Sequence, residues 1–181
     1  MKPKKVACEL LAAGVAILWL GSIPAALAKT VDYSAFEGDF KGHEKFHYPS
    51  LGLQGRGRAE LRLTASSRGA RLFFNRSLHV GELVFPFSER TRFLPNGRFE
   101  SAIAVPNFAH FGNASGRARV TQGKIHFTAT YHMKGTSMSL VEDATIAAIG
   151  RKLTYRVAVE FASLGGLQRV GVFVFAGDRA K

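Results

Sequence analysis

The chain has 181 residues, and its 25 Lys and Arg residues exceed its 13 Asp and Glu residues, which gives a formal net charge of +12. Its one cysteine, Cys8, lies near the N-terminus, so residues 29–181 contain none and a small scaffold held by disulfides is excluded. Residues 29–181 are enough for one domain with a sizeable core. The fold therefore has to be stabilised by packing alone.

The first 28 residues have the pattern of a secretory signal peptide. Residues 2–5 carry three lysines, residues 10–20 are apolar, and residues 26–28, Ala-Leu-Ala, match the small-x-small cleavage box. The apolar run is short for a membrane span of about 20 residues and Pro24 interrupts it, which favours cleavage over an uncleaved anchor. We therefore expect residues 1–28 to be removed and residues 29–181 to form one exported domain, periplasmic or extracellular.

Apolar and polar residues alternate along most of the remaining chain. Between Gly123 and Gly135 the odd-numbered side chains are mainly apolar and the even-numbered ones polar, as expected for a strand with one buried face. Turn residues such as Pro95-Asn96-Gly97 separate the alternating segments. The pattern predicts strands over residues 36–48, 57–65, 70–80, 82–94, 99–105, 114–121, 123–135, 153–161 and 169–175. Pro86, within one of them, indicates an edge or a bulge.

Residues 139–150 are the exception to this alternation. Leu140, Val141 and Ala144 have helical spacing, and Ser139 followed by Glu142 resembles a capping box. We predict a short helix here, with a strand as the alternative.

Eight to ten strands joined by short turns predict an antiparallel meander. A single sheet of that many strands tends to close, so we expect an all-β, up-and-down barrel, with a two-sheet sandwich as the alternative. Gly38-Asp39-Phe40 resembles the Gly-x-aromatic opening of lipocalin-like barrels, over three residues and without the tryptophan.

His43-Glu44-Lys45-Phe46-His47 matches the H-E-x-x-H motif and resembles the zincin metalloproteases, in which two His bind zinc and the Glu activates water. That chemistry needs a helix, which brings residues i and i+4 together, whereas on a strand they lie roughly 13 Å apart. Alternation favours a strand for this segment. We therefore predict no metal, no cofactor and no catalytic residue, and retain His43 and His47 only as an unfavoured zinc-hydrolase alternative.

A set of side chains on the apolar side of each strand is expected to face the barrel interior together: Phe40, Phe46, Leu61, Leu63, Phe74, Phe85, Phe87, Phe99, Ile103, Phe127, Tyr131, Tyr155, Val157 and Phe161. These residues form either a packed core or the wall of an apolar pocket. For a pocket, the candidate ligand-binding residues are Glu44, Phe85, Phe87, Phe99, Tyr131 and Tyr155 inside and Arg58, Arg98 and Arg117 at the rim. Glu44 is notable because it is a carboxylate at a position where the alternation predicts an inward, apolar side chain.

Without the three Lys and one Glu of residues 1–28, 22 basic and 12 acidic residues remain, a net charge of +10. Such a charge favours anionic partners, and export together with the lack of a stacking signature disfavours nucleic acid. The function expected is non-enzymatic binding of an apolar or anionic-headed ligand such as a lipid, or contact with an anionic envelope polymer. A small outer-membrane barrel is the alternative, and a basic surface with no partner also fits the charge.

Overall fold

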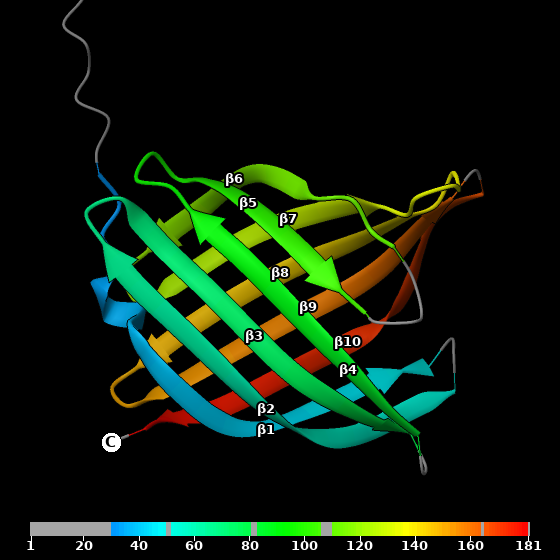
Figure 1. Ribbon diagram of the computed structural model, residues 1–181, viewed down its shortest axis with the longest axis horizontal. Coiled ribbons are helices and arrows are strands. Elements are labelled where there is room, and N and C mark those ends of the chain that lie inside the picture. Colours follow the sequence, from blue (N-terminus) through cyan, green and yellow to red (C-terminus); the bar gives the residue numbers. More distant parts are fainter. Residues whose placement is uncertain (1–29, 50–51, 81–82, 106–109, 164, 181) are drawn as a thin grey trace, which may run out of the picture.

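The computed structural model describes residues 30–49, 52–80, 83–105, 110–163 and 165–180, so the expected signal peptide lies outside the described residues. The described chain is a closed barrel of ten antiparallel strands in up-and-down order, as predicted (Figure 1). The strands are β1 (Gly38–Tyr48), β2 (Leu53–Ser66), β3 (Gly69–Val80), β4 (Leu83–Phe93), β5 (Arg98–Ala104), β6 (Ala114–Thr121), β7 (Lys124–His132), β8 (Ser139–Ile149), β9 (Lys152–Ser163) and β10 (Gly166–Arg179).

The helix predicted over residues 139–150 is wrong, because this segment is strand β8. Leu140, Ala144 and Ile146 are buried on one face, and β8 pairs along its whole length with β7 and β9. Tertiary pairing on both sides outweighs the weak local preference for a helix. Within the described residues no helix has the length and apolar character of a membrane span.

The barrel closes where β1 pairs with β10, with Gly42 opposite Gly177. A side chain at Gly42 would collide with the backbone carbonyl of Ala176, so the close approach of the two strands requires glycine there. Pro86 lies on β4 beyond the last described pair with β5, Ser88–Ala104, which agrees with the expected edge position.

One end of the barrel carries a 3₁₀ turn, η1 (Ser34–Phe36), which lies beside the left-hand strand ends in Figure 1. Tyr33 and Phe36 are buried in the core, and the Tyr33 ring stacks on Phe93 at 5.7 Å. The Tyr33 hydroxyl donates a hydrogen bond to the Leu94 carbonyl, 3.1 Å away. These contacts fix the N-terminal segment over this end, which we call the η1 end; the opposite end is the distal end.

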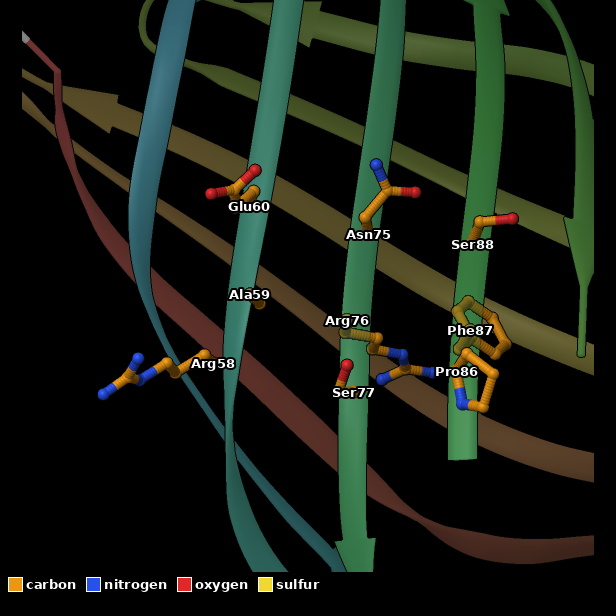
Figure 2. Close-up of a pocket in the computed structure, with 9 residues that line it drawn as sticks. All are labelled: Arg58, Ala59, Glu60, Asn75, Arg76, Ser77, Pro86, Phe87 and Ser88. Carbon is orange, nitrogen blue, oxygen red and sulfur yellow. The ribbon is translucent and has the colours of Figure 1, made fainter. Parts of the chain in front are cut away.

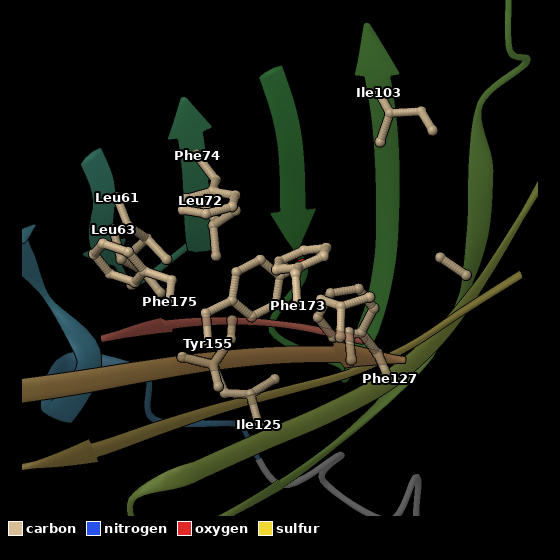
Figure 3. Packing of buried hydrophobic residues seen from close by; sticks show 14 of the residues in the cluster. Leu61, Leu63, Leu72, Phe74, Ile103, Ile125, Phe127, Tyr155, Phe173 and Phe175 are labelled. Atoms are coloured by element: carbon tan, nitrogen blue, oxygen red, sulfur yellow. The ribbon is translucent and has the colours of Figure 1, made fainter. Parts of the chain in front are cut away.

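The interior of the barrel is densely packed with aromatic side chains (Figure 3). Phe74 is surrounded by Tyr155, Phe173 and Phe175, with ring centroids 5.3, 6.0 and 5.4 Å away. Apart from Phe85, whose side chain lies outside the described residues, every residue of the predicted inward set is buried or packed against the core. The parity of the sequence therefore predicted the interior correctly.

Candidate functional site

Six polar side chains, which we call the inner polar cluster, lie inside this apolar barrel: Glu44, Arg76, Glu89, Tyr131, Glu142 and Tyr155. Each sits on the inward parity of its strand, which is why the fold buries it. Arg76 Nη1 donates a hydrogen bond to Glu44 Oε1 at 2.6 Å, and both side chains are almost completely inaccessible to solvent. Burial raises the pKa of Glu44, and the positive charge of Arg76 opposes that rise.

The guanidinium group of Arg76 is held between two aromatic rings. Its central carbon lies 3.9 Å from the Phe87 ring centroid and 3.9 Å from that of Phe173. A cation over aromatic faces is stabilised by the ring quadrupoles, and more so when it is desolvated. The two rings therefore hold Arg76 in place while its guanidinium forms the hydrogen-bonded ion pair with Glu44.

A chain of hydroxyl groups runs from Glu89 across the interior. Glu89 accepts hydrogen bonds from Thr91 Oγ1 and from the Tyr155 hydroxyl, each at 2.7 Å. Thr91 Oγ1 is 2.6 Å from Ser101 Oγ, which is 2.8 Å from the Tyr131 hydroxyl. Because a hydroxyl has one proton to donate, the donation from Thr91 to Glu89 makes Ser101 donate to Thr91 and Tyr131 donate to Ser101.

Glu142 of β8 is a third buried carboxyl group, and Tyr131 is among the groups that influence its pKa. Burial, followed by the nearby Glu89 carboxylate, raises the pKa of Glu142 from its usual 4.5 to about 8. With a pKa near 8, Glu142 is mainly a neutral acid at neutral pH. Burial raises the pKa of Glu89 as well, and its hydrogen bonds from Tyr155 and Thr91 oppose that rise. The chain of hydroxyls thus connects the buried Glu89 carboxyl to Tyr131, an arrangement suited to orienting a polar ligand.

Three atoms of the cluster have no hydrogen-bond partner among the described protein atoms: Glu44 Oε2, Glu142 Oε2 and Arg76 Nε. A buried polar atom without a partner costs about 1–3 kcal/mol, so each is a point where another polar group would be stabilised. Two acceptor oxygens and one donor nitrogen inside the barrel are therefore available to hydrogen-bond a ligand.

Among the described core residues, those of the distal half keep the most exposure. A ring of apolar residues in the distal halves of the strands, which we call the mouth ring, keeps between 4% and 9% of its surface exposed: Tyr48, Phe87, Ile103, Leu140, Val159 and Val170. Core residues nearer the η1 end, such as Leu72, Phe93 and Ile125, are 0% exposed. The packing is therefore less complete toward the distal end than toward the η1 end.

The structure brings some of the predicted site residues together and separates others. Glu44, Tyr131 and Tyr155 belong to the inner polar cluster, Phe87 packs on Arg76, and Phe99 lies deep in the core against Phe127, 5.0 Å away. Phe85 lies on β4, but its side chain is outside the described residues. Of the predicted rim residues, Arg98 and Arg117 are paired across β5 and β6 on the outer wall.

Arg58, the third predicted rim residue, lies instead part-way along the outer wall of β2. It lines a hollow of about 420 Å³ over β2, β3 and β4, together with Asn75, Ser77 and Ser88 (Figure 2). Arg76 and Phe87 also contribute to this hollow, so it lies directly outside the inner polar cluster. Arg58 therefore does not share a site with Arg98 and Arg117.

The H-E-x-x-H segment lies within strand β1, as the alternation indicated. His43 and His47 are exposed on the outer wall, whereas Glu44 points inward to Arg76. In the described part of the chain no three His, Cys, Asp or Glu side chains are grouped as metal ligands would be. That the protein works without zinc stays a prediction.

The sequence reasoning missed Arg76, Glu89 and Glu142. The signal was present, since Arg76 continues the inward parity of Leu72 and Phe74, and Glu89 lies between Phe87 and Phe93 on the same parity. Glu142 was hidden by the incorrect helix prediction. A search of every strand for polar residues at positions where the alternation predicts an inward, apolar side chain would have identified the whole cluster.

No protein-family model matches this sequence, and a search of curated proteins finds no relative. The function is therefore argued from the geometry and chemistry of the barrel.

Replacing Glu142 with Gln is expected to reduce the pH dependence of stability. Because the folded-state pKa of Glu142 is raised from 4.5 to about 8, its stabilising contribution is complete below pH 4.5 and is lost as the pH rises through 8. Gln keeps the neutral form, so the stability difference between the two proteins should change by about 1 kcal/mol per pH unit in this window. Urea unfolding at pH 5 to 8 measures it, and parallel curves for the two proteins would contradict the assignment.

Proposed function

We propose that this protein is an exported binding barrel for an amphipathic small molecule, whose polar head contacts the inner polar cluster and whose apolar part packs on the mouth ring. The observation that supports this most strongly is the set of three unpartnered polar atoms inside a barrel whose interior is mainly apolar. Ligand pockets in proteins combine mainly apolar walls with a few fixed polar groups, and this interior has both.

The charges inside the barrel favour a particular kind of head group. Three buried carboxyl groups accompany one buried guanidinium, and that guanidinium is already paired with Glu44. An anionic head, which the net charge of the sequence suggested, would add a further negative charge in a low-dielectric interior. A hydroxyl, amide or amine head would instead donate to the free oxygens of Glu44 and Glu142.

The outer-membrane alternative has less support from the side-chain orientation. Apolar side chains face the barrel interior, while Arg, Lys and Glu side chains cover much of the outer wall. A membrane barrel places its apolar side chains outward toward lipid.

Binding is tested with a fluorescent long-chain alcohol titrated into the purified protein. We expect saturable 1:1 binding, displaced by an unlabelled alcohol of the same chain length more effectively than by the corresponding carboxylate. Ile103→Trp, which fills space in the mouth ring, should weaken binding about tenfold or more, equivalent to about 1.4 kcal/mol.

The matched control is Val84→Trp, which adds the same side chain at a position 52% exposed on β4. It should leave the affinity unchanged. A lack of saturable binding, or equal losses in the two variants, would contradict the proposal.

A further inference from the structure

The charged residues of the outer wall are distributed unevenly around the barrel. On β3–β6 the described outward-facing charged residues are six arginines and one glutamate: Arg71, Arg90, Arg92, Arg98, Arg117, Arg119 and Glu100. On β7–β10 they are four basic and three acidic residues: Lys124, Lys152, Arg156, Arg169, Asp143, Glu160 and Asp178. The six arginines of β3–β6 all are exposed, and we call them the basic wall.

Two pairs of these arginines face each other directly across neighbouring strands. Arg71 of β3 is the partner of Arg92 of β4, and Arg98 of β5 is the partner of Arg117 of β6. Like charges directly opposite each other on one face destabilise a sheet. The fold gains nothing from these pairs, and their positive charge is available to an anionic partner.

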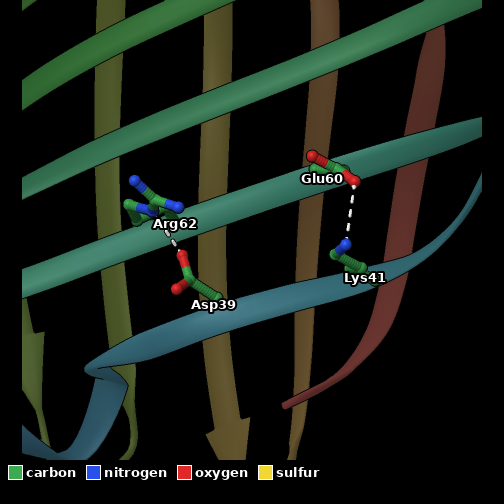
Figure 4. Close-up of polar contacts among 4 residues, drawn as sticks. All are labelled: Asp39, Lys41, Glu60 and Arg62. Atoms are coloured by element: carbon green, nitrogen blue, oxygen red, sulfur yellow. Dashed lines mark hydrogen bonds and ion pairs between the residues drawn. The ribbon is translucent and has the colours of Figure 1, made fainter. Parts of the chain in front are cut away.

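The neighbouring strands β1 and β2 also place Lys45 opposite Arg56, but they contain two cross-strand ion pairs as well (Figure 4). On β1 and β2, Arg62 forms an ion pair with Asp39, and Lys41 lies 3.5 Å from Glu60. In the described part of the chain, none of the six arginines of the basic wall has a carboxylate within 4.0 Å. Two of the five outward basic side chains on β1 and β2 are therefore ion-paired, whereas none of the six on the basic wall is.

The basic wall also contains a shallow hollow of about 330 Å³ at its centre. Arg71, Arg90 and Arg92 line it, together with Glu100, Asn113 and the aromatic side chain of Phe73. Phe73 is 37% exposed, and the guanidinium of Arg90 lies 6.0 Å from its ring centroid. The hollow thus combines separated positive charges with an exposed apolar ring and a neutral hydrogen-bonding group.

We propose that the basic wall binds an acidic polysaccharide, at a site separate from the barrel interior. Such a chain carries anionic groups at intervals, with hydroxyls and apolar sugar faces between them, and these match the arginines, Asn113 and Phe73 respectively. Glu100, the cross-strand partner of Arg92, also lines the hollow and repels any anionic group beside it. A chain with spaced anionic groups can place a hydroxyl there, which the continuous phosphates of a nucleic acid cannot. A membrane surface would call for a larger exposed apolar area than Phe73 provides.

The test compares two triple variants of the full chain on immobilised heparin, used as the acidic polysaccharide. Arg71→Gln/Arg90→Gln/Arg92→Gln removes three charges from the basic wall, and Lys124→Gln/Lys152→Gln/Arg156→Gln removes three from the other side. The first should weaken heparin binding about tenfold and elute at lower salt, whereas the second should change affinity less than about twofold.

Equal losses in the two variants would show that binding follows net charge alone and would overturn the proposal. Tighter binding to duplex DNA or to vesicles of anionic phospholipid than to heparin, at equal salt, would overturn the choice of polysaccharide. Circular dichroism of both variants verifies that the barrel is intact, since all six substituted side chains are exposed.

Discussion

Replacing Arg76 with Met is expected to destabilise the protein by about 3–5 kcal/mol at pH 8, because it leaves the buried Glu44 carboxylate without its partner. The change also removes the cation from between Phe87 and Phe173. A typical domain has an unfolding free energy of about 5–15 kcal/mol, so the variant should be visibly less stable in urea or heat.

The loss should be smaller at acidic pH. Burial already raises the pKa of Glu44, and removing Arg76 raises it further, so that Glu44 is neutralised at a higher pH. An unpaired neutral acid is less costly in the interior than an unpaired carboxylate. Urea unfolding of the variant at pH 5 and pH 8 measures this difference.

The double variant Glu44→Gln/Arg76→Met separates the ion pair from packing. If the main cost is an unpaired charge, the double variant should recover a large part of the stability lost by Arg76→Met, because both charges are gone. Arg58→Met, on the exposed wall of β2, is the control and should change stability by less than about 0.5 kcal/mol. Additive losses in the double variant would show that Glu44 and Arg76 do not act as a pair.

Much of the barrel was predictable because its outer wall is polar on most strands. In β7 every inward residue is aliphatic or aromatic and every outward residue is polar, so the alternation shows both the strand and its buried face. In β8 the outward residues Val141 and Ala147 are also apolar and are half-buried. Alternation disappears there, and a helical spacing could be fitted to the same residues.

The inner polar cluster was less predictable because its contacts depend on how the barrel closes. Glu44 was identified by its parity alone, but its partner Arg76 lies 32 positions away, and the bond from Tyr155 to Glu89 spans 66 positions. The alternation along one strand predicts which side chains point inward. The relative register of the ten strands determines which of those side chains contact each other. The hydroxyl chain through Thr91 and Ser101 likewise requires the register of β4 and β5, which no local pattern in the sequence fixes.

Replacing Phe74 with Ala is expected to reduce the free energy of unfolding by about 3–5 kcal/mol, since Phe74 is 0% exposed and lies among three aromatic rings. The matched control is Phe73→Ala, the same substitution one residue earlier on the opposite face of β3, where 37% of the side chain is exposed. That change should cost less than about 1 kcal/mol.

The ratio of the two losses, measured by urea unfolding at one pH, tests both the register of β3 and the packing of the interior. Equal losses at Phe73 and Phe74 would mean that β3 does not alternate between core and solvent as the structure has it. A small loss at Phe74 alone would mean that its ring borders a void and that the interior is a pocket rather than a packed core. With the rings of Tyr155, Phe173 and Phe175 at 5.3, 6.0 and 5.4 Å, we expect the packed-core result at Phe74 and ligand contacts only nearer the distal end.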